Sequence, residues 1–218
     1  MSKNFRTVLF DLDGTLTDSS PGILNSVKYA LEKMSWEIPD DAVLNKFLGP
    51  PLTDSFAEFC GMDEEQSYNA AAVYRERYRD YCVIENSLYD GICDVLEQLS
   101  GAGKILAVAT TKPEIMAEKI VSHFGIRKFF TAVCGAAPDG ANGKKANIIR
   151  NALAACGEDD LGRALMIGDR FYDIEGAKEA GIASVGALYG YGSRSELEEA
   201  GADYIAAAPN EIVKIILK

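Results

Sequence analysis

Short apolar runs alternate with longer helical patterns along most of the chain. The first run consists of β-branched or large apolar residues, and all of the runs are short and largely apolar, which is typical of buried strands. They are Thr7–Phe10, Ile105–Ala109, Thr131–Cys134, Ala164–Ile167 and Ala183–Leu188, with Tyr204–Ala207 as a shorter sixth. Helical spacing between them predicts helices over Ile92–Leu99, Glu114–Phe124, Asn147–Cys156, Ile174–Ala180 and Glu196–Ala200. This alternation predicts an α/β fold with a doubly wound, Rossmann-like parallel sheet.

Glycines follow several of the predicted helices, where a left-handed residue ends a helix at little cost. These glycines are Gly101, Gly125, Gly157, Gly181 and Gly201.

Residues 19–86 interrupt the alternation, because they carry helical patterns and no strand pattern. The patterns cover Gly22–Met34, Asp41–Leu48, Leu52–Phe59 and Glu64–Tyr81. An insertion of this size predicts a second, smaller, all-helical domain, which leaves residues 1–18 and 87–218 as the core domain. We expect the helical domain to rest over the end of the first strand.

Two carboxylates follow the first predicted strand. Asp11 and Asp13 stand at i and i+2 and therefore point the same way in an extended segment, after which Gly14 allows a turn. Neighbouring carboxylates repel each other and are costly to desolvate, and a divalent cation would remove that cost. One of them could then attack an electrophile. The alternative is a solvated acidic turn.

Polar residues also follow three other predicted strands, and ligands of open parallel sheets bind at such strand ends. Thr110 could donate to an anion, although it also fits a helix N-cap before Pro113. Lys144 and Lys145 precede a helix whose N-terminus favours anions, although most lysines lie on the surface.

The fourth strand end carries Asp169, with Asp173 one helical turn later. Asp169 could instead cap the following helix. Gly176 and Ala177 would let that helix pack closely.

The composition narrows the choice of partners. The 218 residues include 33 acidic and 22 basic ones, which gives a formal charge of −11 and a pI near 4.6. This balance argues against nucleic acid and against anionic membrane surfaces as partners. A small anion can still bind where a metal ion and local donors outweigh the overall charge.

The sequence does not predict a zinc site, a disulfide framework, a signal peptide or a membrane span. The five cysteines form no C-x-x-C pair, which argues against a zinc site or a disulfide framework. Met1–Arg6 leads into the first strand without the apolar segment of a signal peptide, and no apolar run reaches the roughly 18 residues of a membrane span. We therefore expect a cytoplasmic protein.

Taken in order, these motifs resemble those of the haloacid dehalogenase superfamily, in its phosphoglycolate phosphatase-like branch. The D-x-D-G-T motif corresponds to Asp11–Thr15, the strand-end hydroxyl to Thr110, and the lysine before a helix to Lys145, with Lys144 as the fallback. The G-D-x-x-x-D motif starts at Gly168. The helical insertion corresponds to the family's cap domain. The chain departs from many members at Ala146, where they have proline, and at Gly168, where they have an acidic residue.

The resemblance implies a Mg²⁺-dependent phosphatase that hydrolyses a small phosphomonoester. Asp11 would be the nucleophile that forms an aspartyl phosphate, and Asp13 the general acid and base. Mg²⁺ would be held by Asp11, the backbone carbonyl of Asp13 and Asp169. Thr110 and Lys145 would bind the phosphoryl oxygens. Asp173 would orient Lys145 or a water molecule at the metal.

Other functions remain open at this stage. A sugar phosphomutase shares the fold and the phosphorylated aspartate, whereas a dehalogenase would lack Asp13. A receiver that accepts a phosphoryl group without turnover also uses an acidic pocket, a threonine and a lysine, but it has neither the D-x-D-G-T motif nor a helical cap. A binding protein without activity is a further alternative. The substrate, a phosphorylated metabolite such as phosphoglycolate, a nucleoside monophosphate, a sugar phosphate or pyrophosphate, is not determined, nor is the choice between monomer and dimer.

Overall fold

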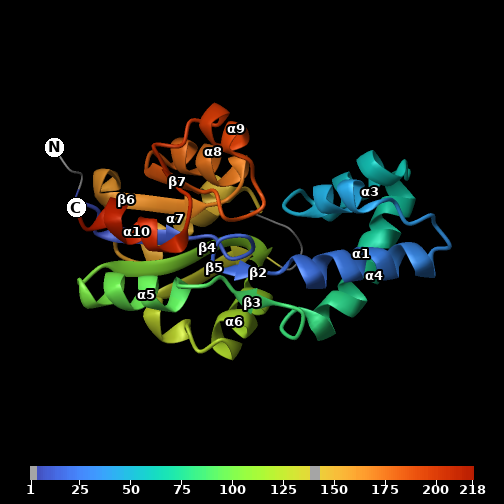
Figure 1. Ribbon diagram of the computed structural model, residues 1–218, viewed down its shortest axis with the longest axis horizontal. Helices are drawn as coiled ribbons and strands as arrows, with labels where there is room; N and C mark the ends of the chain where they lie inside the picture. The colour runs from blue at the N-terminus through green and yellow to red at the C-terminus, as the bar shows by residue number, and fades with distance from the viewer. Residues whose placement is uncertain (1–3, 138–142) are drawn as a thin grey trace. The chain divides into compact units, whose positions relative to one another are not determined.

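The computed structural model describes residues 4–137 and 143–218 and divides the chain into two compact units (Figure 1). The core unit runs up to Asp18 and resumes at Leu88, and the helical unit comprises Ser19–Ser87. Where the chain passes between the units, strand β2 (Thr17–Asp18) pairs with strand β3 (Ser87–Leu88) in a two-stranded ribbon.

The core unit is built, within the described residues, on one six-stranded sheet with the order β5-β4-β1-β6-β7-β8. Its strands are β1 (Thr7–Phe10), β4 (Ile105–Pro113), β5 (Ala132–Ala136), β6 (Ala164–Gly168), β7 (Ala183–Ala187) and β8 (Tyr204–Ala206). Every pair is parallel, and Thr7 of the central strand β1 faces Ile105 on one side and Ala164 on the other. The predicted doubly wound α/β fold is confirmed.

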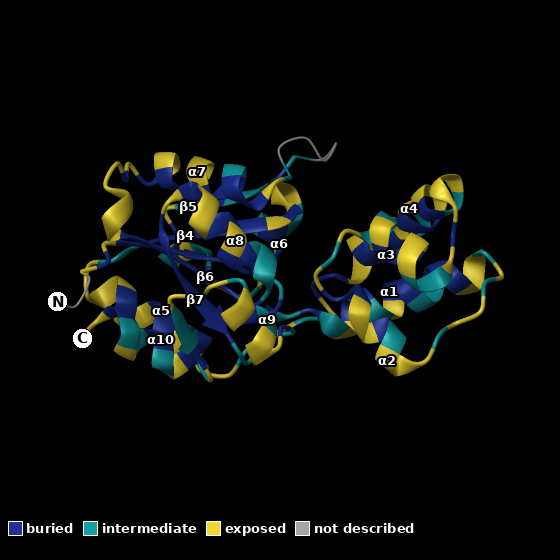
Figure 2. Ribbon diagram, turned by 90° about the horizontal axis from the view of Figure 1, so that it is seen from above, coloured by how far each residue is buried: buried dark blue, intermediate teal, exposed yellow. Residues whose placement is uncertain are grey.

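Helices cover the sheet on both sides. They are α5 (Ile92–Gly101), α6 (Glu114–His123), α7 (Lys145–Ala155), α8 (Phe171–Ala180), α9 (Arg194–Glu199) and α10 (Pro209–Ile216). Helices α7 and α8 contact each other, and α5 contacts α10 on the opposite side of the sheet from α7 (Figure 2). One buried cluster joins Leu9 and Met166 of the strands to Ile149 of α7 and Ala177 of α8. Residues 7–10 of β1 and 164–168 of β6 are all buried, as expected for central strands of a sheet that is covered on both faces.

The helical unit contains α1 (Ser20–Lys33), α2 (Asp41–Leu44), α3 (Leu52–Cys60) and α4 (Glu64–Tyr81), with a 3-10 turn at Asn45–Phe47. Helix α4 packs against α1 and α3. Asp63 and Gln66 form a capping box at its N-terminus, which satisfies backbone N–H groups that the helix leaves unpaired. Val27, Phe56 and Ala71 are fully buried inside this unit.

The sequence patterns miss some details of these elements. Helix α10 and the β2–β3 ribbon are not predicted. The prediction for Gly101 is wrong, because α5 continues through that residue and Gly103 takes the left-handed conformation, with φ of 75°. The polar loop expected before Lys144 and the first residues of the chain lie partly outside the described residues. No helix in the described part of the chain is long and apolar enough to cross a membrane.

Candidate active site

Three buried carboxylates meet beyond the carboxyl ends of β1 and β6. Asp11 follows β1, Asp169 follows β6, and Asp173 lies in the first turn of α8. One oxygen from each lies within 4.8 Å of the others. All three residues are buried, so water screens their mutual repulsion poorly. An all-oxygen cluster of this charge suits a hard divalent cation.

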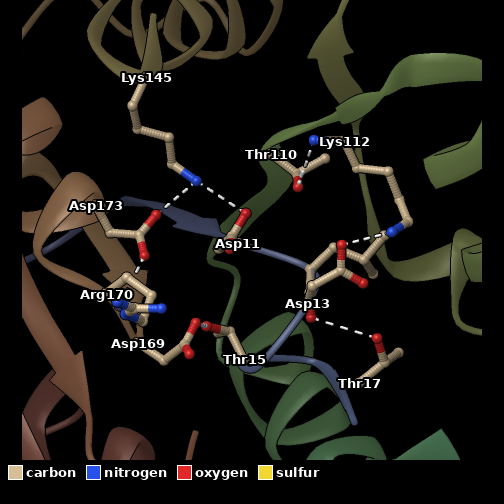
Figure 3. A network of polar contacts seen from close by, with 11 residues as sticks. Asp11, Asp13, Thr15, Thr17, Thr110, Lys112, Lys145, Asp169, Arg170 and Asp173 are labelled. Carbon is tan, nitrogen blue, oxygen red and sulfur yellow. Dashed lines mark hydrogen bonds and ion pairs between the residues drawn. The ribbon is translucent and has the colours of Figure 1, made fainter. Parts of the chain in front are cut away.

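Lys145, the first residue of α7, places its ammonium between two of these carboxylates (Figure 3). Its Nζ lies 2.8 Å from Asp11 Oδ1 and 2.5 Å from Asp173 Oδ1. The neighbouring Lys144 is the N-cap residue of α7, is largely exposed and pairs at 2.7 Å with Glu179. The structure therefore brings Lys145, and not Lys144, into the cluster.

The buried cluster raises the pKa values of two of its carboxyl groups. Burial raises the pKa of Asp11 to about 6; repulsion from Asp173 adds to this effect and the charge of Lys145 opposes it. Burial, followed by repulsion from Asp173 and Asp11, also raises the pKa of Asp169 well above its usual range. Burial alone would lower the pKa of Lys145, but attraction to Asp11 and Asp173 raises it, so this side chain stays an ammonium ion.

Missing side chains at two glycines make room for the cluster. A Cβ atom at Gly168 would overlap the carboxyl group of Asp173, and one at Gly176 would overlap the stem of Lys145. Any larger residue at position 168 would therefore compete with Asp173 for the same space. Asp173 Oδ2 accepts a hydrogen bond from the backbone N–H of Arg170 at 3.1 Å.

The loop after β7 holds Asp169 from the other side. The backbone N–H of Tyr191 donates to Asp169 Oδ2 at 2.9 Å, and the hydroxyl of Thr15 donates to Oδ1 at 3.2 Å. Glycines on both sides of Tyr191 allow this approach, because a Cβ at Gly190 or Gly192 would overlap Asp169. Asp169 is thus a fixed acceptor and not the N-cap of α8, which is Arg170.

Asp13 forms an ion pair with Lys112 beside the carboxylate cluster. Its Oδ2 lies 2.5 Å from Nζ of Lys112, which is almost completely buried near the end of β4 (Figure 3). Thr110 is also buried, and its hydroxyl accepts a hydrogen bond from the backbone N–H of Lys112 at 3.3 Å. The alternative of Thr110 as a helix N-cap is wrong, because Pro113 occupies that position in α6.

The structure thus brings Asp11, Lys145, Asp169 and Asp173 into one network, with the Asp13 side chain beside it. The carboxylate cluster contains Asp173, whereas the expected metal ligands were Asp11, Asp169 and the backbone carbonyl of Asp13. That role of the Asp13 carbonyl stays a prediction. The sequence patterns do not predict Lys112, because the pairing of β4 with β5 is irregular between Ala109 and Pro113. They also miss Tyr191, which contributes a backbone group that no residue pattern marks.

Comparisons with known proteins agree on one family. A family model for haloacid dehalogenase-like hydrolases matches residues 8–187. The chain is 43% identical over 197 residues to a 5′-nucleotidase of Pseudomonas aeruginosa, covering 88% of this chain and 87% of that protein. It is 37% identical over 201 residues to tyrosine-protein kinase PtkA of Mycobacterium tuberculosis, covering 92% and 68%. A phosphoglycolate phosphatase of Vibrio parahaemolyticus is 27% identical over 223 residues, covering 98% and 97%. The crystal structure of a predicted phosphatase from Clostridium acetobutylicum matches with a TM-score of 0.91 at 43% identity, over 98% of each chain.

Gly168→Ala tests the packing of Asp173. The added methyl group must displace the carboxyl group, and we expect the free energy of unfolding to fall by about 1–3 kcal/mol. Gly101→Ala is the matched control, since a Cβ there meets nothing within 4 Å and alanine favours the helix. Urea unfolding of both variants measures the difference. Equal stability of the two variants would contradict this packing.

Lys145→Met tests the balance of charge. Removing the ammonium leaves buried carboxylates unpaired, and we expect a loss of about 3–5 kcal/mol of unfolding free energy at pH 8. The loss should shrink toward pH 5, because the carboxylates then take up protons. Lys144→Met, at an exposed pair, should change stability little at either pH. A pH-independent loss in Lys145→Met would show that packing, and not charge, is responsible.

Proposed function

Because this chain belongs to the haloacid dehalogenase-like hydrolase family, we propose that it is a Mg²⁺-dependent phosphatase that hydrolyses a small phosphomonoester through an aspartyl phosphate on Asp11. The observation that carries the proposal is the buried cluster of Asp11, Asp169 and Asp173 around Lys145. A phosphate monoester repels an approaching carboxylate, so the reaction needs positive charge and alignment at the same place. Lys145 supplies one positive charge at this place, and the carboxylates could hold a cation that supplies more.

The residues present fit a divalent cation. Asp11 and Asp169 have raised pKa values because burial and repulsion from neighbouring carboxylates disfavour their charged forms, and Lys145 pairs with Asp11 and Asp173. Asp11 and Asp169 would hold Mg²⁺, with the backbone carbonyl of Asp13 as the proposed third ligand. The ion would supply positive charge to the phosphoryl oxygens and keep Asp11 ionised.

Asp11 is the proposed nucleophile. Its carboxylate oxygen attacks phosphorus, the bond to the leaving alcohol breaks, and the phosphoryl group becomes attached to Asp11. Lys145, held by Asp173, donates to a phosphoryl oxygen and stabilises the charge that develops there. Thr110 is the proposed hydroxyl donor to another phosphoryl oxygen. Both donors come from elements whose ends meet at this edge of the sheet.

Asp13 is the proposed general acid and base. It gives a proton to the leaving alcohol and then takes one from the water that attacks the phosphoryl group. Inorganic phosphate is released and Asp11 is regenerated. The same carboxyl group thus serves both halves of the reaction and ends in its starting protonation state.

The substrate class is proposed from the named relatives. The 43% identity to a 5′-nucleotidase favours a nucleoside 5′-monophosphate as the first compound to test, followed by phosphoglycolate. Sugar phosphates and pyrophosphate complete the panel.

Asp11→Asn tests the proposed nucleophile. We expect inorganic phosphate to be released from at least one member of the panel only when Mg²⁺ is present, and the substitution to lower turnover by roughly 10³-fold or more. Asp159→Asn, an exposed site away from the cluster, is the control and should retain activity. Substantial turnover by Asp11→Asn would remove Asp11 from this role. A phosphorylated protein without release of phosphate would favour a receiver instead.

Mg²⁺ binding should depend on pH, because protons compete for Asp11 and Asp169. With the pKa of Asp11 raised to about 6, the metal-free folded protein binds more protons than the unfolded chain between about pH 4 and 6. Its stability therefore falls as pH rises through that range, and a cation that binds the ionised site restores stability above it. We expect Mg²⁺ to raise Tm more at pH 7.5 than at pH 5, at matched ionic strength. An equal rise at both pH values would contradict binding at these carboxylates.

A further inference from the structure

Lys112 is a buried cation that the proposed mechanism does not use. It lies within β4, two residues beyond Thr110, and both residues are buried. The side chain is 6% exposed, and its Nζ lies 2.5 Å from Asp13 Oδ2. Burying an ammonium and a carboxylate removes both from water, and this desolvation lowers the stability of the folded state.

The two oxygens of Asp13 have different surroundings. Lys112 contacts Oδ2, whereas Oδ1 is buried and has no hydrogen-bond partner among the described residues. A buried oxygen without a hydrogen-bond partner destabilises the folded protein. A proton on this oxygen, or a donor from a bound molecule, would remove that cost. Oδ1 is therefore the oxygen left to exchange a proton with another molecule.

We propose that Lys112 is a positioning residue for Asp13: its ammonium donates a hydrogen bond to Oδ2 in both protonation states of the carboxyl group and thereby assigns proton transfer to Oδ1. The proposal rests on the proposed phosphatase function, in which Asp13 is the general acid and base. Lys112 acts through Asp13 and does not bind the phosphoryl group.

The proton balance follows from this arrangement. In the first half-reaction, the O–H on Oδ1 gives its proton to the leaving alcohol oxygen as the bond from that oxygen to phosphorus breaks. The carboxylate that results is stabilised by the charge of Lys112, so the hydrogen bond to Oδ2 becomes an ion pair as the proton leaves. In the second half-reaction, the attacking water returns a proton to Oδ1. Lys112 stays protonated throughout.

Substrates with different leaving groups isolate this role. An alkyl phosphate, such as a nucleoside 5′-monophosphate or phosphoglycolate, releases a poor leaving group that needs a proton. p-Nitrophenyl phosphate releases a stable phenolate that needs little help. The ratio of kcat/KM for the two substrates reports proton donation during phosphoryl transfer. Measured on one preparation, this ratio is also independent of the fraction of protein that is folded.

Lys112→Met is the test variant, with Lys144→Met as a control at a surface pair. We expect Lys112→Met to lower the alkyl-to-aryl ratio by about 10- to 100-fold, part of the contribution typical of general acids, and Lys144→Met to leave it unchanged. Lys112→Gln, which keeps an N–H donor without the charge, should lower the ratio by less and carries the test if the methionine variant does not fold. An equal loss for both substrates, as expected if Lys112 bound the phosphoryl group, would overturn the proposal, and so would an unchanged ratio.

Turnover by the wild-type protein distinguishes a failure of the Lys112 inference from a failure of the proposed phosphatase function. Turnover of both substrates by the wild type with an unchanged ratio in the Lys112 variants rejects the inference alone. Turnover of neither substrate in the presence of Mg²⁺ rejects the phosphatase itself.

Discussion

The repulsion among three buried carboxylates is the constraint on which the site depends. Asp11, Asp169 and Asp173 have been brought together where water screens them poorly, and the ammonium of Lys145 pairs with two of them. Such an arrangement opposes folding, and a protein retains it where the unbalanced charge is useful. In the proposed function, a divalent cation makes up this deficit of positive charge. The cation would also allow Asp11 to approach a phosphate.

The rest of the core unit holds this cluster in place. Parallel strands bring residues to one edge of the sheet that are 134 positions apart in the chain, as in the ion pair between Lys145 and Asp11. Glycines at 168 and 176 remove the side chains that would push Asp173 and Lys145 away. The loop containing Tyr191 fixes Asp169 through a backbone hydrogen bond. Rigid supports of this kind keep like charges together that would otherwise separate.

Much of the fold and part of the site are predictable from the sequence, because strands buried on both faces are continuously apolar and their ends carry the polar residues. Asp11, Asp13 and Asp169 are found in this way. The local pattern does not choose between Lys144 and Lys145, although the family resemblance favours Lys145, because the start of α7 is not marked in the sequence. Lys112 is missed because the apolar run ends at Ala109, whereas backbone pairing with β5 extends the strand to Pro113. The support from Tyr191 is a tertiary contact of the backbone, which leaves no trace in local composition.

Trapping of the phosphorylated aspartate tests the central claim most directly. Borohydride reduces an acyl phosphate to an alcohol, so addition during turnover with Mg²⁺ should convert Asp11 to homoserine, which mass spectrometry of the peptide containing residue 11 would detect. Without Mg²⁺ or without substrate, Asp11 should remain unmodified. Active turnover with no modification of Asp11, or with modification at a different carboxylate, would contradict the assignment of Asp11 as the nucleophile.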